Sequence, residues 1–76
     1  MKIQYSKEAV KFLKKQDRST QIRITNAINN LPAGDVVKLQ GRSGYRLRVG
    51  SYRIIFSNDG IVLLIEKIDN RGQIYK

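Results

Sequence analysis

The fold of this chain is decided by residues 45–56, which read YRLRVGSYRIIF. Apolar and other side chains alternate on both sides of Gly50-Ser51, a pattern typical of two strands joined by a two-residue turn. Glycine at the first position of such a turn favours type II′, whose twist matches that of the strands. The turn sets a register in which Arg48 lies directly opposite Arg53.

The alternation also assigns the side chains of this hairpin to two faces, because successive residues of a strand point to opposite sides of a sheet. The apolar face, expected to lie in the core, carries Tyr45, Leu47, Val49, Tyr52, Ile54 and Phe56. The other face carries Arg46, Arg48 and Arg53. Opposed like charges destabilise a sheet, so we interpret the three arginines as a site for an anionic ligand. Phosphate oxygens match the planar fork of a guanidinium.

Two amphipathic helices are predicted in the first half of the chain. The first covers about 7–15 and has Ser6 at its N-cap. The second is capped by Asp17 or Ser19 and is stopped by Pro32. Because only a very short segment connects the two helices, they are expected to form an antiparallel hairpin.

A strand over 2–5 precedes the helices, and a short extended segment at 37–39 follows them. The last strands are predicted at 45–49, 52–57 and 61–68, and the apolar run of the third indicates an interior position in the sheet. The order β-α-α-β-β-β predicts an α+β fold, with a twisted, mostly antiparallel sheet. The helical hairpin covers one face and leaves the other open. The length of 76 residues fits a single domain over 1–76.

The amino-acid composition limits the partners and the catalytic groups that this chain can use. The chain has 15 Lys and Arg against 6 Asp and Glu, for a net charge of +9, which suits a polyphosphate partner. It has no cysteine and no histidine, so thiolate nucleophiles, histidine acid-base chemistry and the usual zinc ligands are excluded. The lack of cysteine favours a reducing, cytoplasmic environment. No apolar run is long enough for a signal peptide core or a membrane span.

Glu66 is placed in one of two ways by the turn that follows the hairpin. If Asp59-Gly60 is the whole turn, Glu66 pairs with Arg53 and lies on the arginine-bearing face, where it holds that guanidinium or acts as a base. If Asn58 also belongs to the loop, the register slips by one residue and Glu66 turns away. The sequence leaves both turns open.

Three segments, in order along a small basic chain, resemble the RelE/ParE superfamily of toxin-antitoxin toxins, and the RelE-like branch in particular. They are VKLQG at 37–41, the hairpin at 45–56, and KIDNRGQIY at 67–75. The resemblance covers almost the whole chain and implies a RelE-like fold of the microbial ribonuclease type. It implies a type II toxin that cuts mRNA in the ribosomal A site and so inhibits translation. The alternatives are a ParE-like inhibitor of DNA gyrase and a non-cleaving module that binds RNA or the ribosome.

The resemblance also implies roles for the arginines of the hairpin. Arg46 and Arg48 match the paired basic residues that hold the RNA backbone and the scissile phosphate. Arg53 matches an arginine that stabilises the transition state. Arg53 is therefore a catalytic candidate, and so is Arg48 because of its match to a residue at the scissile phosphate. Lys38 and Arg42, from the preceding segment, are further candidates for RNA binding.

Two more catalytic candidates lie at the end of the chain. Arg71 matches the arginine of the family's C-terminal motif. Tyr75 matches its terminal aromatic residue, which stacks on a base or assists proton transfer. Asn70 stands where many relatives carry histidine. Because arginine stays protonated, the general base is Tyr75, Glu66 or Asp69, or the ribosome contributes.

The implied reaction is attack of a ribose 2′-hydroxyl on the adjacent phosphate, in which converged arginines supply electrostatic stabilisation. No metal ion or other cofactor is expected. The expected partners are the ribosome, mRNA and an acidic, RelB-like antitoxin, and no membrane.

Overall fold

A computed structural model of the chain describes residues 2–70. Its elements are β1 (Lys2–Tyr5), α1 (Lys7–Lys14), α2 (Arg18–Asn29), β2 (Asp35–Lys38), β3 (Tyr45–Val49), β4 (Tyr52–Asn58) and β5 (Val62–Asn70). The α+β class is confirmed. Four strands follow the helices rather than three, because the extended segment predicted at 37–39 begins earlier and pairs with β3 along its whole length.

Both helices begin at side-chain caps. The Oγ atom of Ser6 accepts a 3.0 Å hydrogen bond from the amide of Ala9 at the start of α1. At α2 the cap is Asp17 rather than Ser19, since an Asp17 carboxylate oxygen accepts a 3.0 Å bond from the amide of Thr20. The hydrogen bonds from Thr20 hold the pKa of the Asp17 carboxyl below its ordinary value.

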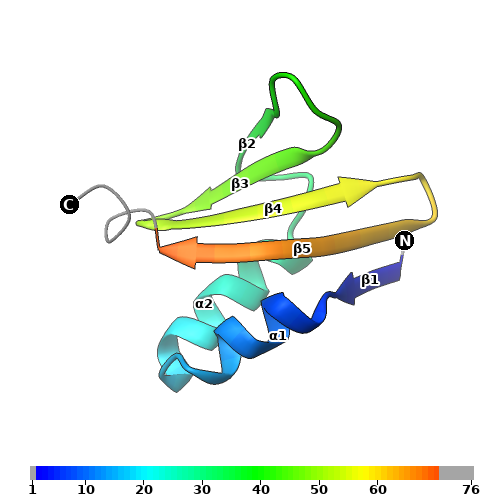
Figure 1. The fold of residues 1–76 in the computed structure, drawn as a ribbon. Coiled ribbons are helices and arrows are strands. Elements are labelled where there is room, and N and C mark those ends of the chain that lie inside the picture. The colour runs from blue at the N-terminus through cyan, green and yellow to red at the C-terminus, as the bar shows by residue number, and fades with distance from the viewer. Residues whose placement is uncertain (1, 71–76) are drawn as a thin grey trace.

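The strands form one sheet in the order β1-β5-β4-β3-β2. β1 pairs in parallel with β5 and the other neighbours are antiparallel, so the prediction of a mostly antiparallel sheet is confirmed. Figure 1 shows the sheet running from β2 through β3 and β4 to β5. β5 lies between β1 and β4, which confirms the interior position that its apolar run predicts.

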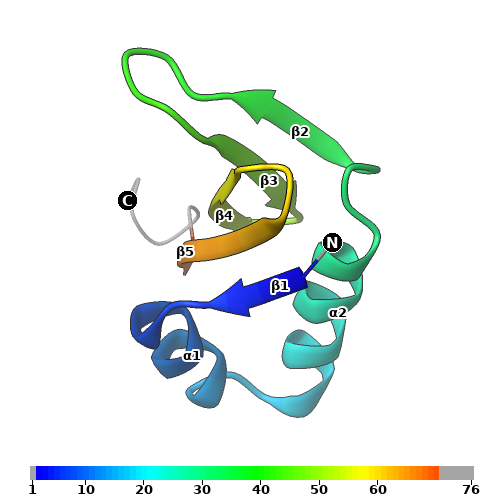
Figure 2. The same cartoon turned by 90° about the vertical axis from the view of Figure 1, so that its right-hand side faces the viewer.

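One face of the sheet is covered by the two helices, which lie together on the same side of it (Figure 2). α1 packs against β5 and α2 against β3. Ile24 and Ile28 of α2 are fully buried. Together with Ala9 they form one core cluster with Leu47, Ile54, Phe56, Leu63, Ile65 and Ile68 of the sheet. Among the residues that the structure describes, no helix covers the opposite face. Within residues 2–70, no helix is long and apolar enough to cross a membrane.

Candidate nucleic-acid interface

The β3–β4 hairpin has the predicted register. Arg48 pairs with Arg53 and Arg46 pairs with Ile55, while Leu47 pairs with the core residue Ile54. The three arginines therefore share the face opposite the helices, which we call the arginine face. Gly50 has φ of +59° and no non-glycine residue of the described chain has positive φ, in agreement with the predicted type II′ turn.

Arg53 is held by Asp69 of β5, directly opposite it in the sheet. Its Nη2 atom lies 2.9 Å from Oδ2 of Asp69 and its Nε atom lies 3.3 Å from Oδ1. The pair is partly buried, with 29% of the Arg53 side chain and 13% of the Asp69 side chain exposed. A two-point contact of this kind fixes the plane of the guanidinium. Asp69 was expected only as a candidate base, and its contact with Arg53 was not predicted.

Neither predicted turn between β4 and β5 occurs. Asn58 pairs with Leu63, and the ladder then continues from that pair toward Arg53. A β-bulge interrupts it, since Ile65 and Lys67 have consecutive partners on β4 and Glu66 is the extra residue. The first alternative, in which Glu66 pairs with Arg53, is therefore wrong. The physical reason is that the longer turn and the bulge together move the register by three residues.

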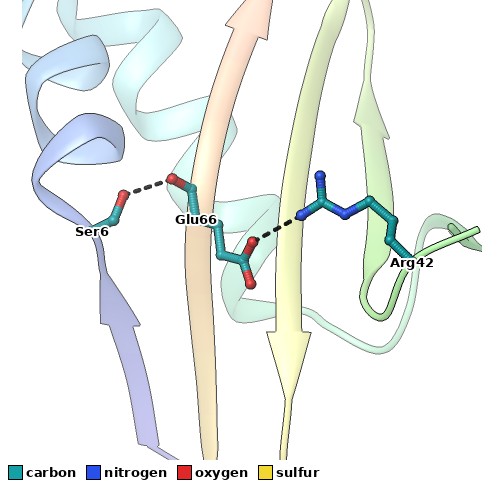
Figure 3. Close-up of polar contacts among 3 residues, drawn as sticks. All are labelled: Ser6, Arg42 and Glu66. Carbon is teal, nitrogen blue, oxygen red and sulfur yellow. Dashed lines mark hydrogen bonds and ion pairs between the residues drawn. The ribbon is translucent and has the colours of Figure 1, made fainter.

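Glu66 instead contacts Arg42 of the β2–β3 loop, with 3.3 Å between Oε1 and Nη2. Figure 3 shows the Arg42 side chain reaching toward β5, in front of the sheet and with the helices behind. Lys38 pairs with Tyr45, whose ring stacks on Phe56 on the helix side, so the register sets Lys38 apart from the arginine face.

The other two arginines of the face are held less firmly. The Nε atom of Arg48 lies 4.0 Å from Oδ2 of Asp35, and both side chains are largely exposed. The Nε atom of Arg46 is buried and has no hydrogen-bond partner within the described residues. A buried donor without an acceptor costs about 1–3 kcal/mol of stability.

One cation of this face was missed. Lys67 pairs with Ile55 and therefore lies in the same row as Arg46. The spacing of the buried residues of β5 in the structure marks the bulge that brings Lys67 to this face. Leu63 and Ile65 are two residues apart, as in a regular strand, but the next buried residue, Ile68, is three further on. Such a break in alternation is typical of a bulge.

A cavity of about 600 Å³ lies beside Ser57 and Asn58, at the C-terminal end of β4 and away from Arg53. Gln4, Tyr45 and Leu64 also line it, and Arg46, Arg48 and Arg53 do not. Arg48 lines a separate, smaller cavity of about 350 Å³ together with Gly34 and Val49. Arg71 and Tyr75, the two candidates from the C-terminal motif, lie outside the described residues.

Solved structures with this fold identify the family. The toxin-antitoxin complex RelB-RelE from Methanococcus jannaschii contains a chain with 30% sequence identity and a TM-score of 0.75, and 93% of each chain is covered. This chain belongs to the RelE family of toxins. A chain of the archaeal RelE-RelB complex from Pyrococcus horikoshii OT3 has 27% identity to this RelE-family chain and a TM-score of 0.77, over 95% of this chain and 96% of that one.

YafQ from E. coli strain BL21(DE3) has 22% identity to this RelE-family chain and a TM-score of 0.63, with 97% of both chains covered. At that identity the likeness shows the fold alone. No family model matches the sequence, and no curated protein matches it. The RelE assignment predicted from the three sequence segments is confirmed by the likeness to solved structures.

Proposed function

We propose that this chain is the toxin of a type II toxin-antitoxin system and that it inhibits translation by cutting mRNA in the ribosomal A site. One observation carries the proposal: Arg48 and Arg53 face each other on an open sheet surface of a RelE-family chain. Directly opposed like charges repel each other, and Asp35 beside Arg48 and Asp69 beside Arg53 offset part of this repulsion. A phosphate between the two guanidiniums converts the repulsion into two favourable contacts.

The reaction that suits this surface is attack of a ribose 2′-hydroxyl on the adjacent phosphate. Negative charge builds up on the phosphate oxygens in the transition state, and fixed cations around them lower its free energy. Asp69 orients Arg53, so this guanidinium is the best-positioned of the three. Arg48 and Arg46 supply further positive charge along the RNA backbone.

Proton transfer needs a different group, since arginine does not release its proton. Both oxygens of Asp69 accept hydrogen bonds from Arg53, and Glu66 is paired with Arg42. We therefore assign the general base to Tyr75, whose phenolate form arginines close to it would favour. Arg71 provides a second cation from the same motif, and the chemistry assigned to these residues uses no metal ion.

The proposal includes an acidic, RelB-like antitoxin as partner. Two similar structures are complexes of RelE with RelB. The net charge of +9 favours a negatively charged partner, and an antitoxin segment covering the arginine face would block RNA. We place the activity in the cytoplasm, where ribosomes and mRNA are found. A neighbouring gene for a small acidic protein would support the pairing.

Induction of the chain in growing cells, followed by primer extension on abundant mRNAs, tests the proposal. We expect cuts within codons of translated messages, and we expect Arg53→Ala combined with Tyr75→Ala to abolish them. Arg18→Ala removes an exposed arginine from α2 and is the matched control that should still cut. DNA damage signalling with intact mRNA would identify a gyrase inhibitor instead. Translation arrest without cuts would identify a module that only binds.

A further inference from the structure

The backbone of Glu66 is held from two directions. It is the extra residue of the bulge in β5, and bulges redirect side chains. Its carbonyl oxygen accepts a 2.7 Å hydrogen bond from the hydroxyl of Ser6, where β1 passes into α1. Figure 3 shows Glu66 between these contacts, with its carbonyl toward Ser6 and its carboxylate toward Arg42. The carboxylate therefore projects from a fixed point of the sheet.

The loop that carries Arg42 has a defined shape at its base. Gly41 and Gly44 have φ of +74° and +114°, values that favour glycine, and they stand on either side of the Arg42-Ser43 pair. The amide of Leu39 donates a 3.0 Å hydrogen bond to the carbonyl oxygen of Gly44, which closes the loop. A Cβ atom on Gly44 would lie 3.2 Å from the carbonyl oxygen of Phe56, so the loop ends close to β4.

The contact between the two side chains uses only part of the Arg42 guanidinium. Nη2 meets Oε1 of Glu66 at 3.3 Å, and 62% of the Arg42 side chain remains exposed. The other N–H donors are therefore open to solvent and to a phosphate. An exposed pair of this kind adds little to stability, so its effect lies in where the guanidinium is held.

We propose that Glu66 is a positioning residue for RNA binding, which holds Arg42 over the sheet as an additional phosphate contact beside the arginine face. This inference rests on the proposed function and extends its substrate surface from the hairpin arginines to the β2–β3 loop. A residue step of about 3.3 Å along β5 separates Glu66 from Asp69 by roughly 10 Å. Arg42 therefore lies nearer the N-terminal end of β5 than Arg53 does. An extended RNA backbone lying along β5 reaches both.

The sign of the effect makes the inference testable. A carboxylate near RNA repels phosphate, so loss of a merely nearby Glu66 tightens binding. Loss of a Glu66 that positions Arg42 weakens binding. We expect Glu66→Ala and Arg42→Ala each to raise the Kd for a single-stranded RNA oligonucleotide by about 2–5-fold, the range typical of an exposed ion pair. The double variant should bind no worse than Arg42→Ala alone.

Salt dependence gives a second readout, measured by fluorescence anisotropy over a range of salt concentrations. Loss of one phosphate contact reduces the slope of log K against log salt by about 1, and both single variants should show this change. Glu8→Ala, which removes an exposed carboxylate from α1, is the control and should not weaken binding. Tighter binding by Glu66→Ala, or an effect of Glu66→Ala that persists in the Arg42→Ala background, overturns the inference.

Arg48→Ala separates this inference from the function on which it rests. If Arg48→Ala weakens RNA binding and Glu66→Ala does not, the arginine face binds RNA and only the positioning role fails. If neither variant changes binding, the proposal of an RNA-cutting toxin fails with it.

Discussion

The hydroxyl of Ser6 donates a 2.7 Å hydrogen bond to the carbonyl oxygen of Glu66, 60 residues later in the chain. The same Oγ atom accepts the amide proton of Ala9. One side chain therefore caps α1 and fastens the start of that helix to the bulge of β5. The backbone amide of Ser6 adds a 2.9 Å bond to the carbonyl oxygen of Ile65.

We expect Ser6→Ala to lower the free energy of unfolding by about 1–3 kcal/mol, because the variant loses a helix cap and leaves the Glu66 carbonyl without its donor. Urea denaturation followed by circular dichroism measures the change. Ser43→Ala, in the exposed β2–β3 loop, is the control and should change stability by less than about 0.5 kcal/mol. Equal stability of the two variants would contradict the structural role of Ser6.

Arg48→Thr is expected to separate stability from activity. The change removes a like charge opposite Arg53 and introduces a residue that favours strands, so stability should be unchanged or should rise by up to about 1 kcal/mol. RNA cleavage should fall, since a cation at the phosphate is lost. Thermal denaturation and primer extension on the same variant test both halves. A large loss of stability would indicate that Arg48 serves the fold.

Arg53→Lys keeps the charge and removes the fork that meets both oxygens of Asp69. Because lysine cannot make this two-point contact, the cation is no longer held in one orientation, and we expect cleavage to fall at least about tenfold. Cleavage rates on programmed ribosomes provide the measurement. Arg18→Lys, outside the arginine face, should cut at the parent rate. Full activity of Arg53→Lys would mean that charge alone suffices.

The stability of the fold should depend on pH because of the hydrogen bonds that the Asp59 carboxylate accepts. One of its carboxylate oxygens accepts bonds of 2.9 and 2.7 Å from the amides of Ile61 and Val62, and these bonds hold the pKa of Asp59 below its ordinary value. The stabilisation is therefore fully present above the pKa of the unfolded chain and is lost as pH falls through the folded value.

Asp59→Asn keeps an acceptor and loses the charge. The parent chain should be more stable than this variant near neutral pH, and the difference should shrink as the pH falls below about 4. Urea midpoints measured across this range give the comparison. A difference that stays constant with pH would show that the charge of Asp59 contributes nothing.

Local sequence signals predict much of this fold. The Gly50-Ser51 turn and the alternation around it place the hairpin arginines on one face, because a two-residue turn leaves no freedom of register. The start of α1 follows from the side chain of Ser6 in the same way. These features depend on residues within a few positions of one another.

The carboxylate partners of the arginines are set by contacts between residues far apart in the sequence, and they were not predicted. Arg53 meets Asp69 only because the β4–β5 turn and the bulge at Glu66 act together, and two irregular features cannot be combined from a turn motif alone. The contact between Arg42 and Glu66 joins a loop to a strand that is not its neighbour in the sheet. The break in the spacing of buried residues before Ile68 is visible only in the structure, because residues 61–65 are all apolar in the sequence.

The parallel pairing of β1 with β5 has a consequence for how the chain is made. β1 is synthesised first, yet its partner β5 is the last strand of the sheet to follow. Closing this contact means bringing together segments separated by most of the chain, which has a large entropic cost and slows folding. During synthesis, therefore, the N-terminal strand and helices lack their main packing surface, and the cooperative fold can form only after β5 has been synthesised.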